Sequence, residues 1–422
     1  MWNTFQVPRI GSAAVRTLRG DKARTISTYI EIMPETSSSA GVAPVPGNVT
    51  NRRRHSRFAL PHAKLSQFNF VLGTGITSTA LHNVGAYVLS DVLFVLAIGG
   101  YCALTACVAV RWARDPRVVL PDVRESWFGG FAFPAGAGVI AARSTLLGVE
   151  WPALTFTAVA AVTWVLLVYC AIAAGVGDDA RRHSAMTDAD AETGPADRPW
   201  RPDGLMRVDG SWFVLVVSSQ SVAVAAGATA AAFHHPRLAE LAAICWSVGV
   251  VQLAAMIALG AARLLLAPLR SVDDVAPFWV FMGACMISVL GGSEVLAAAG
   301  QQSFVDDAVL TSVCAVLWSF GSWLVPLLIV MMLWDWRRED TYSGFRTSLW
   351  SMVFPLGMWG EASRELGEVR RIDWLIDLGT AEAWVVFTVW CAVFAGMLAW
   401  WWRWWTGREL RPSPADVDAH RQ

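Results

Sequence analysis

The sequence predicts an all-α integral membrane protein whose chain crosses the bilayer ten times. Apolar residues make up 55% of the 422 positions and charged residues 16%, a balance typical of membrane proteins rather than of large soluble enzymes. A membrane-spanning helix needs about 20 consecutive, mostly apolar residues. Ten stretches meet this requirement, and they cover residues 68–86, 91–111, 127–147, 153–174, 211–232, 239–265, 277–298, 308–334, 349–366 and 382–402.

Polar segments flank these spans and divide the chain into three parts. Residues 1–64 are basic and rich in Ser, Pro and Gly, without the apolar core of a signal peptide. We expect them to form a disordered cytoplasmic tail. Residues 65–405 then form the ten-helix domain, and residues 406–422 form a second cytoplasmic tail.

The distribution of basic residues predicts the orientation in the membrane. If the N-terminus is cytoplasmic, most of the 33 Lys and Arg residues fall in the two tails and in the loops on the cytoplasmic side. The positive-inside rule therefore favours a multi-pass protein of the cell membrane with both termini in the cytoplasm. The basic run at residues 51–57 is expected to contact anionic lipid, and no nucleic-acid partner is expected.

The ten spans alternate between two kinds. Odd-numbered spans carry Gly, Pro, Ser or Thr at mid-depth, as in residues 128–138 and 281–293, whereas even-numbered spans such as 154–174 are more uniformly apolar. Small polar residues and helix breakers are tolerated in the bilayer where they pack against protein or line a wet cavity. The alternation predicts five helical hairpins around a central pore, with odd helices inside and even helices outside. Close helix packing is the alternative explanation of the small residues.

Four motifs on this frame carry a resemblance to a known family. They are FVLGTGITSTALH (70–82), WFVLVVSSQSVAV (212–224), PFWVFMGACMIS (277–288) and WSMVFPLGM (350–358). In this order they resemble the tellurite-resistance/dicarboxylate transporter family, which includes malate transporters, sulfite exporters and the slow-type anion channels of plant guard cells. The resemblance covers residues 66–402. It implies one pore per subunit, lined by the odd helices, and assembly as a homotrimer.

The resemblance also implies a gate in the ninth span. In the family a phenylalanine directly before a proline closes the pore, and Phe354 is the matching residue. Its neighbours Pro355 and Gly357 would kink the helix and leave room for the ring to move. Phe133, which precedes Pro134 in the third span, is expected to narrow the pore at the same level.

The other predicted pore-lining residues are small or carry hydroxyl or amide groups. Such groups replace part of the hydration shell of an anion and bind it weakly enough for release. The complete predicted lining consists of Gly73, Thr74, Gly75, Thr77, Phe133, Pro134, Gly136, Ser219, Gln220, Gly283, Ser288, Pro355 and Gly357.

Two charged residues within the spans are predicted to lie at the outer vestibule of the pore. Arg143 lies two turns from Gly136 on one helical face and would attract an incoming anion; a snorkelling or salt-bridged arginine is the alternative. Glu361 follows Phe354 by seven residues and faces the same way, which is unfavourable for an anion path. We expect Arg364, Arg143 or a proton to neutralise it.

These features predict the transport of small anions through a phenylalanine-gated pore, with malate, sulfite and tellurite as candidates. If Glu361 or Glu294 titrates together with transport, the protein is instead a proton-coupled dicarboxylate symporter. A membrane-embedded enzyme is disfavoured because the sequence lacks a catalytic cluster of His and acidic residues, and neither a metal nor another cofactor is expected. The expected partners are small anions and the lipid bilayer.

Overall fold

The computed structural model describes residues 65–114, 127–190, 210–266, 275–298, 305–337 and 345–406. Within these ranges the regular structure is entirely helical. The all-α prediction is therefore confirmed for the described part of the chain. Apart from Thr406, the two predicted tails lie outside the described residues.

Ten long α-helices match the ten predicted spans. They are α1 (Asn69–Asn83), α2 (Tyr87–Arg114), α5 (Ala132–Thr145), α6 (Glu150–Asp190), α7 (Val214–Phe233), α8 (Pro236–Leu266), α9 (Trp279–Ala298), α10 (Asp307–Trp336), α11 (Trp350–Arg370) and α12 (Asp373–Trp405). The short helix α4 (Trp127–Gly130) precedes α5. Short 3-10 turns precede the other odd-numbered spans, and they are η1 (Leu65–Phe68), η3 (Gly210–Phe213), η4 (Ala276–Phe278) and η5 (Thr347–Leu349).

Seven of the described helices are long and apolar enough to cross a membrane, whereas the sequence predicted ten. These seven are α2, α6, α7, α8, α9, α10 and α12. Helices α1 and α5 have only 15 and 14 residues, because α1 ends at Asn83, before the end of its predicted span, and α5 begins only after the break at Phe131. Helix α11 has 21 residues, but Glu361, Arg364, Glu365 and Glu368 in its second half make it too polar.

The helices differ strongly in burial. In the apolar segments of α7 and α9, 94% and 78% of the residues are buried, compared with 11% in α6 and 22% in both α2 and α12. Most residues of α1, α5 and α11 are buried as well. Five helices thus form the interior of the bundle, and five expose most of their surface.

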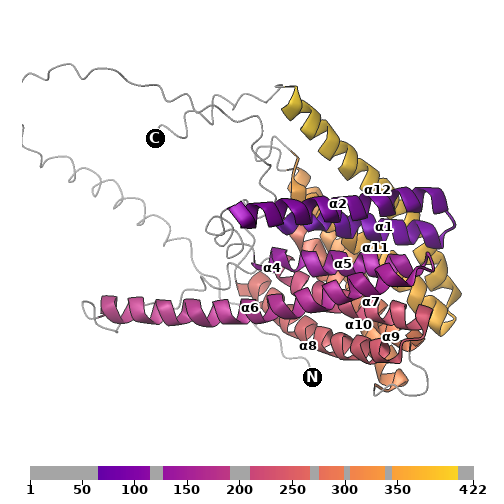
Figure 1. Cartoon of the computed structure of the whole chain (residues 1–422), viewed down its shortest axis with the longest axis horizontal. Helices are drawn as coiled ribbons and strands as arrows, with labels where there is room; N and C mark the ends of the chain where they lie inside the picture. Colours follow the sequence, from indigo (N-terminus) through magenta and orange to yellow (C-terminus); the bar gives the residue numbers. More distant parts are fainter. Residues whose placement is uncertain are drawn as a thin grey trace, which may run out of the picture. The chain divides into compact units, whose positions relative to one another are not determined.

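The contacts among the buried helices close on themselves. Helix α1 contacts α5, α5 contacts α7, α7 contacts α9, α9 contacts α11, and α11 contacts α1. Each of these five also contacts the exposed helix that follows it in the chain. Figure 1 shows the long helices running alongside one another. We call α1, α5, α7, α9 and α11 the inner helices.

Glycines permit the closest contacts between the inner helices. A Cβ atom built on Gly283 of α9 would lie 2.9 Å from Cγ of Pro355 in α11. A Cβ atom on Gly138 of α5 would lie 2.7 Å from the carbonyl oxygen of Ser221 in α7. Because no larger side chain fits at these distances, both glycines serve close helix packing.

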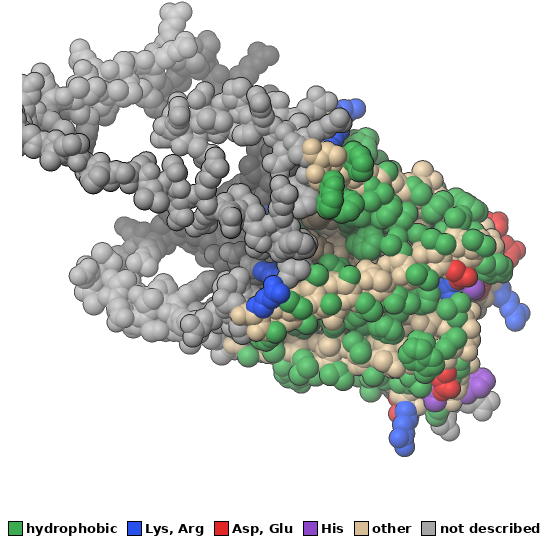
Figure 2. Space-filling model, turned by 45° about the horizontal axis from the view of Figure 1, so that its top comes forward, with side chains coloured by type: hydrophobic (Ala, Val, Ile, Leu, Met, Phe, Trp, Pro, Cys, Tyr) green, Lys and Arg blue, Asp and Glu red, His purple; other side chains and the backbone are tan. Residues whose placement is uncertain are grey.

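The side surface of the bundle is mainly apolar. Figure 2 shows hydrophobic side chains over the helix sides and charged side chains gathered toward the helix ends. Large apolar residues such as Val88, Val251 and Trp323 are among the most exposed. An apolar surface of this kind is unfavourable in water and is suited to contact with lipid.

Candidate functional site

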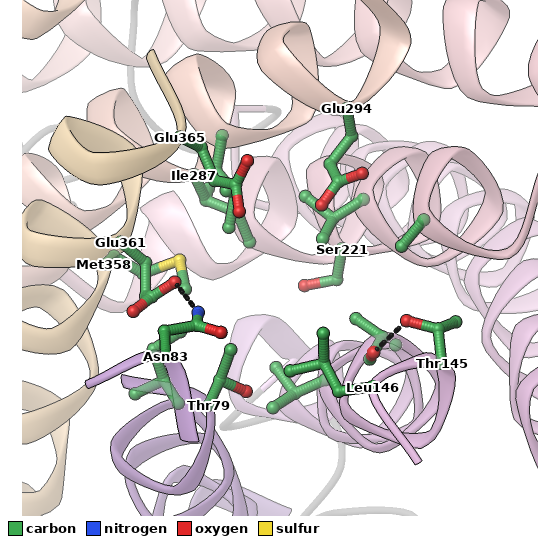
Figure 3. A pocket seen from close by; sticks show the side chains of 17 residues that line it. Thr79, Asn83, Thr145, Leu146, Ser221, Ile287, Glu294, Met358, Glu361 and Glu365 are labelled. Atoms are coloured by element: carbon green, nitrogen blue, oxygen red, sulfur yellow. Dashed lines mark hydrogen bonds between the residues drawn. The ribbon is translucent and has the colours of Figure 1, made fainter. Parts of the chain in front are cut away.

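One cavity lies between the inner helices. Its volume is about 60 Å³, which is enough for a few water molecules or a small anion. All five inner helices contribute side chains to its wall (Figure 3). Its polar lining residues are Thr79, Asn83, Thr145, Ser221, Glu294, Glu361 and Glu365.

The lining follows a regular spacing along four of the inner helices. Positions separated by three and then four residues lie on one helical face. Each of the four helices contributes one such set of three, and the sets are Ile76, Thr79 and Asn83; Ser221, Val224 and Ala228; Ile287, Leu290 and Glu294; and Met358, Glu361 and Glu365. Since Asn83 ends α1 and Glu294 lies in the last turns of α9, the polar part of the cavity lies toward the C-terminal ends of the inner helices.

Three carboxyl groups face the cavity, and two of them are ion-paired. Glu361 is 3% exposed and accepts hydrogen bonds from Nδ2 of Asn83 at 2.8 Å and from Arg364 at 3.1 Å. Arg364 also forms ion pairs with Glu365 and with Glu368 outside the cavity lining. The guanidinium group therefore offsets part of the negative charge beside the cavity.

The third carboxyl group has a different environment. Glu294 comes from α9, and Figure 3 shows it directed into the same space without a hydrogen bond to another residue drawn there. Its Cβ atom lies 2.9 Å from the position that a Cβ on Gly227 of α7 would occupy. Glu294 is therefore held by helix packing at its stem, and its carboxyl group faces the cavity.

Ser221 is the hydroxyl group most available to a ligand. Its Oγ atom is buried and has no hydrogen-bond partner within the described residues. The other cavity hydroxyls are engaged, because Thr79 donates to the carbonyl of Gly75 at 3.2 Å and Thr145 donates to the carbonyl of Ala142 at 2.7 Å. A buried donor without a partner is costly, so a ligand that accepts this hydrogen bond would be favoured.

Phe354 lies just beyond the lining residues of α11. It is 2% exposed, and it precedes Met358 by four residues and Glu361 by seven, so it lies on the helical face that lines the cavity. Pro355 packs against Gly283, and Gly357 lies against Ile76 of α1. The ring is therefore placed one turn from the cavity, on the side of the helix N-termini.

The predicted hydroxyl and amide groups of the lining lie elsewhere. Thr74 accepts a hydrogen bond from Nε1 of Trp390 in α12 at 3.0 Å, and Ser219 accepts one from Nε1 of Trp164 in α6 at 2.8 Å. Both therefore face exposed helices rather than the cavity. Interhelical bonds of this kind fasten an inner helix to an outer one.

Three further predicted donors are also engaged outside the cavity. Gln220 donates from Nε2 to the carbonyl of Trp246 in α8 at 3.2 Å. Thr77 and Ser288 each donate to a carbonyl one turn earlier in their own helix, at 2.7 Å. None of these five groups is among the cavity residues.

The predicted glycines are packing positions. Gly73 lies against Val353 and Trp350 of α11, and Gly75 lies against Val139 of α5. Gly136 faces Tyr101 of α2. Gly283 and Gly357 make similar contacts. All five glycines therefore agree with close helix packing, the alternative explanation of the small residues in the odd-numbered spans.

The two prolines differ in their effect on the backbone. Pro134 is buried in the first turn of α5, where a missing N–H leaves no hydrogen bond broken, so it starts a helix instead of kinking one. Pro355 lies inside α11 and removes a backbone hydrogen bond there.

Phe133 does not reach the cavity. Its ring contacts that of Phe68 at 5.2 Å and stacks on that of Tyr101 at 5.1 Å, measured between centroids. It lines a separate apolar groove with residues of α2 and α6, including Val108 and Leu166. The expectation that it narrows the pore beside Phe354 is not supported by this placement.

Arg143 is salt-bridged within the bundle, as the alternative interpretation proposed. It is fully buried and donates to Asp91 and Ser90 of α2, both at 2.9 Å, and to Ser78 of α1 at 3.1 Å. Its guanidinium carbon also lies 5.1 Å from the ring centroid of Phe94. Arg143 therefore ties α5 to α1 and α2 and does not line the cavity.

Sequence reasoning identified Glu361 and pointed to Glu294, but it missed the other polar lining residues, which are Thr79, Asn83, Thr145, Ser221 and Glu365. A usable signal was present in the spacing. In each of four odd spans, three residues at positions i, i+3 and i+7 lie on one helical face. In three of these four faces, the residue at i+7 is Asn or Glu.

Comparison with known proteins agrees with the motif resemblance. Residues 62–398 match the protein family described as voltage-dependent anion channel. Two uncharacterized membrane proteins of Mycobacterium tuberculosis, from strains CDC 1551/Oshkosh and ATCC 25618/H37Rv, are each 37% identical to this chain over 138 residues. The aligned part is 32% of this chain and 70% of each relative. Because the family match spans most of its length, this chain belongs to the voltage-dependent anion channel family.

Proposed function

We propose that this protein passes small anions across the cell membrane through the cavity between the inner helices, and that Phe354 gates the path. The observation that carries this proposal is that five helices, each in contact with the next, all line one cavity. A path along the axis of such a ring is separated from lipid by protein, as polar groups at membrane depth require. Membership of the anion channel family supports an anion as the cargo.

The chemistry of the cavity suits weak anion binding. Ser221 offers a hydroxyl donor without a partner, and the charge of Glu361 is offset by Asn83 and Arg364. An anion that accepts a hydrogen bond from Ser221 is bound without a fixed countercharge, which allows rapid release. The negative charge of the acidic lining residues would disfavour two anions in the cavity at once. It would favour an anion that carries a proton.

Phe354 would close this path from the side of the helix N-termini. An aromatic ring at a narrow point blocks an ion both sterically and by excluding water. Pro355 leaves one backbone carbonyl of the preceding turn unpaired, so a small rotation of α11 at this point disturbs few hydrogen bonds.

The proposal includes the wider arrangement inferred from the sequence. The inner helices and their exposed successors would form five hairpins around the pore, with both termini in the cytoplasm. Three copies would assemble as a homotrimer, each with its own pore. The exposed apolar surface of the outer helices would then be shared between lipid and neighbouring subunits.

Flux measurements on the purified chain in liposomes test the function. Malate, sulfite, nitrate, chloride and tellurite would be compared side by side, with a neutral solute of similar size as the control. We expect anion-selective flux that depends on the protein. Flux of the neutral solute alone would contradict the proposal.

A proton-coupled symporter is the second candidate, and Glu294 is the observation in its favour. Its carboxyl group faces the cavity without the ion pairs that hold Glu361 and Glu365. A carboxyl group in such a place could exchange a proton with each transported dicarboxylate. In that case a pH gradient would drive malate uphill, and Glu294→Gln would abolish the uphill accumulation.

A further inference from the structure

A second buried carboxyl group lies outside the cavity. Glu382 belongs to α12, a helix that exposes most of its surface, yet this residue is 3% exposed. Both of its carboxyl oxygens lack a hydrogen-bond partner within the described residues. The group is also absent from the cavity lining, so the proposed anion path makes no use of it.

Glu382 lies in a very close contact between α11 and α12, which we call the α11/α12 seam and define by Gly357, Gly360, Gly379, Glu382 and Val386. A Cβ atom on Gly360 would clash with Oε2 of Glu382. A Cβ atom on Gly379 would lie 2.5 Å from the carbonyl oxygen of Gly360, and one on Gly357 would lie 3.4 Å from Cγ2 of Val386. The seam leaves no space beside the carboxyl group for the water that an ionised form requires.

The charged groups of α11 near the seam either are acidic or are engaged in other ion pairs. On α11, Glu361 is the acidic neighbour that acts on Glu382. The Cβ atom of Arg364 lies near Gly379. The guanidinium group of Arg364, however, pairs with Glu361, Glu365 and Glu368.

Among the described residues, helix α1 supplies no countercharge to Glu382. On α1, which also contacts α12, Asn83 is bonded to Glu361, and the ring of His82 packs edge-on against that of Tyr87. A buried carboxyl group with an acidic neighbour and no countercharge is held in the neutral, protonated form.

We propose that Glu382 is a proton-binding site and that its proton holds α11 against α12. Loss of the proton leaves a bare carboxylate in the seam, which is relieved only when α11 and α12 separate and water enters. Gly360 lies six residues after Phe354 on α11. Opening of the seam therefore moves the helix that carries the proposed gate, and this last step rests on the proposed function.

The test uses the purified full-length chain and the isosteric, permanently neutral variant Glu382→Gln. Glu240→Gln is the matched control, because Glu240 is an exposed glutamate of α8. Infrared difference spectra should show a protonated carboxyl C=O band in the wild type that Glu382→Gln removes and Glu240→Gln retains. If Glu382→Gln does not fold, Glu382→Met is to be measured in its place.

Hydrogen exchange tests whether loss of the proton from Glu382 separates α11 from α12. We compare the α11 peptide segment 356–368 between the wild type and Glu382→Gln at about pH 6 and at about pH 9. The two proteins should exchange equally at the lower pH, and the wild type should exchange about tenfold faster at the higher pH because only its seam opens. In liposomes, wild-type anion flux should rise over the same range, and Glu382→Gln should lose this response.

Two results would overturn the proposal. One is an unchanged carboxyl band in Glu382→Gln, and the other is equal exchange of the segment in both proteins at the higher pH. Neither measurement requires transport, so both decide the proposal even if the protein passes no anion. Conversely, anion flux without these two changes would leave the proposed function standing and remove the proton site.

Discussion

Phe354 is proposed as the gate on two grounds, the family resemblance and its position next to the cavity. Its ring is buried one turn before the lining residue Met358, on the same face of α11. Replacement by Ala removes the ring and leaves the helix intact. We expect Phe354→Ala to raise anion flux in liposomes about tenfold, equivalent to a barrier lower by about 1.4 kcal/mol.

The matched control is Phe133→Ala, since Phe133 also precedes a proline but packs on Phe68 and Tyr101 away from the cavity. That variant should leave flux within about twofold of wild type and should lower the thermal stability, because a partly buried ring that packs on Phe68 and Tyr101 is lost. If both variants changed flux equally, or if folded Phe354→Ala matched wild type, the gate assignment would be wrong.

Ser221 makes a second prediction at this scale. Its hydroxyl group is the unpartnered cavity donor, and a hydrogen bond to a charged ligand contributes about 1.5–3 kcal/mol. Ser221→Ala should therefore weaken apparent anion affinity about tenfold in a concentration series of flux, with little change in thermal stability. Ser219→Ala is the control, because Ser219 bonds Trp164 and Gln252 instead. It should lower stability by about 1 kcal/mol and leave the affinity unchanged, and the reverse pattern would contradict the site.

The difference between these two serines explains why the lining was difficult to predict. A step of two residues turns an α-helix by about 200°, so Ser219 and Ser221 face opposite sides, as do Thr77 and Thr79. Inner helices carry small polar residues on both faces, since hydroxyls such as Ser219 also bind outer helices. The composition of a span therefore identifies it as an inner helix, but it does not show which face of that helix lines the cavity.

At the scale of elements, the sequence was sufficient to place the helices. Ten apolar stretches correspond to the ten long helices, because bilayer-length apolar runs are a strong signal. The lengths of α1 and α5 were not predictable in this way. Helix α1 ends at Asn83, before the end of its predicted span, and α5 begins only after a break that follows α4. Helix α4 contacts η1 and η3, which are distant from it in sequence.

The contact between α9 and α11 gives a prediction for an element pair. A Cβ atom on Gly283 would lie 2.9 Å from Pro355, so Gly283→Ala must push α11 away from α9 or distort it. We expect a loss of about 1–3 kcal/mol in the free energy of unfolding, measured by thermal unfolding in detergent.

The control for Gly283→Ala is Gly99→Ala in α2, because a Cβ atom there meets nothing within 4 Å. Alanine is a better helix former than glycine, so Gly99→Ala should be neutral or stabilising by up to about 1 kcal/mol. Equal destabilisation by both variants would mean that the α9–α11 contact is looser than described.

At the scale of the whole molecule, the charges are distributed in layers. The side surface is apolar and the helix ends are charged (Figure 2). Within the bundle, Glu361, Glu365 and Glu368 pair with one arginine, Arg364. A passive anion path and a proton-coupled carrier are both compatible with such a distribution. They differ in whether a proton moves with each anion, which is a property of the complete transport cycle.

Reversal potentials in a planar bilayer separate these two mechanisms. For a passive path carrying a monovalent anion, a tenfold anion gradient sets a reversal potential of about 59 mV, and a pH gradient adds nothing to it. For a symporter, the pH gradient shifts the reversal potential because protons share the current. Since Glu361 and Glu365 are ion-paired, we expect the passive result with wild-type protein. A shift with pH that disappears in Glu294→Gln would instead establish proton coupling at Glu294, and a shift that persists in that variant would place the coupling proton on another group.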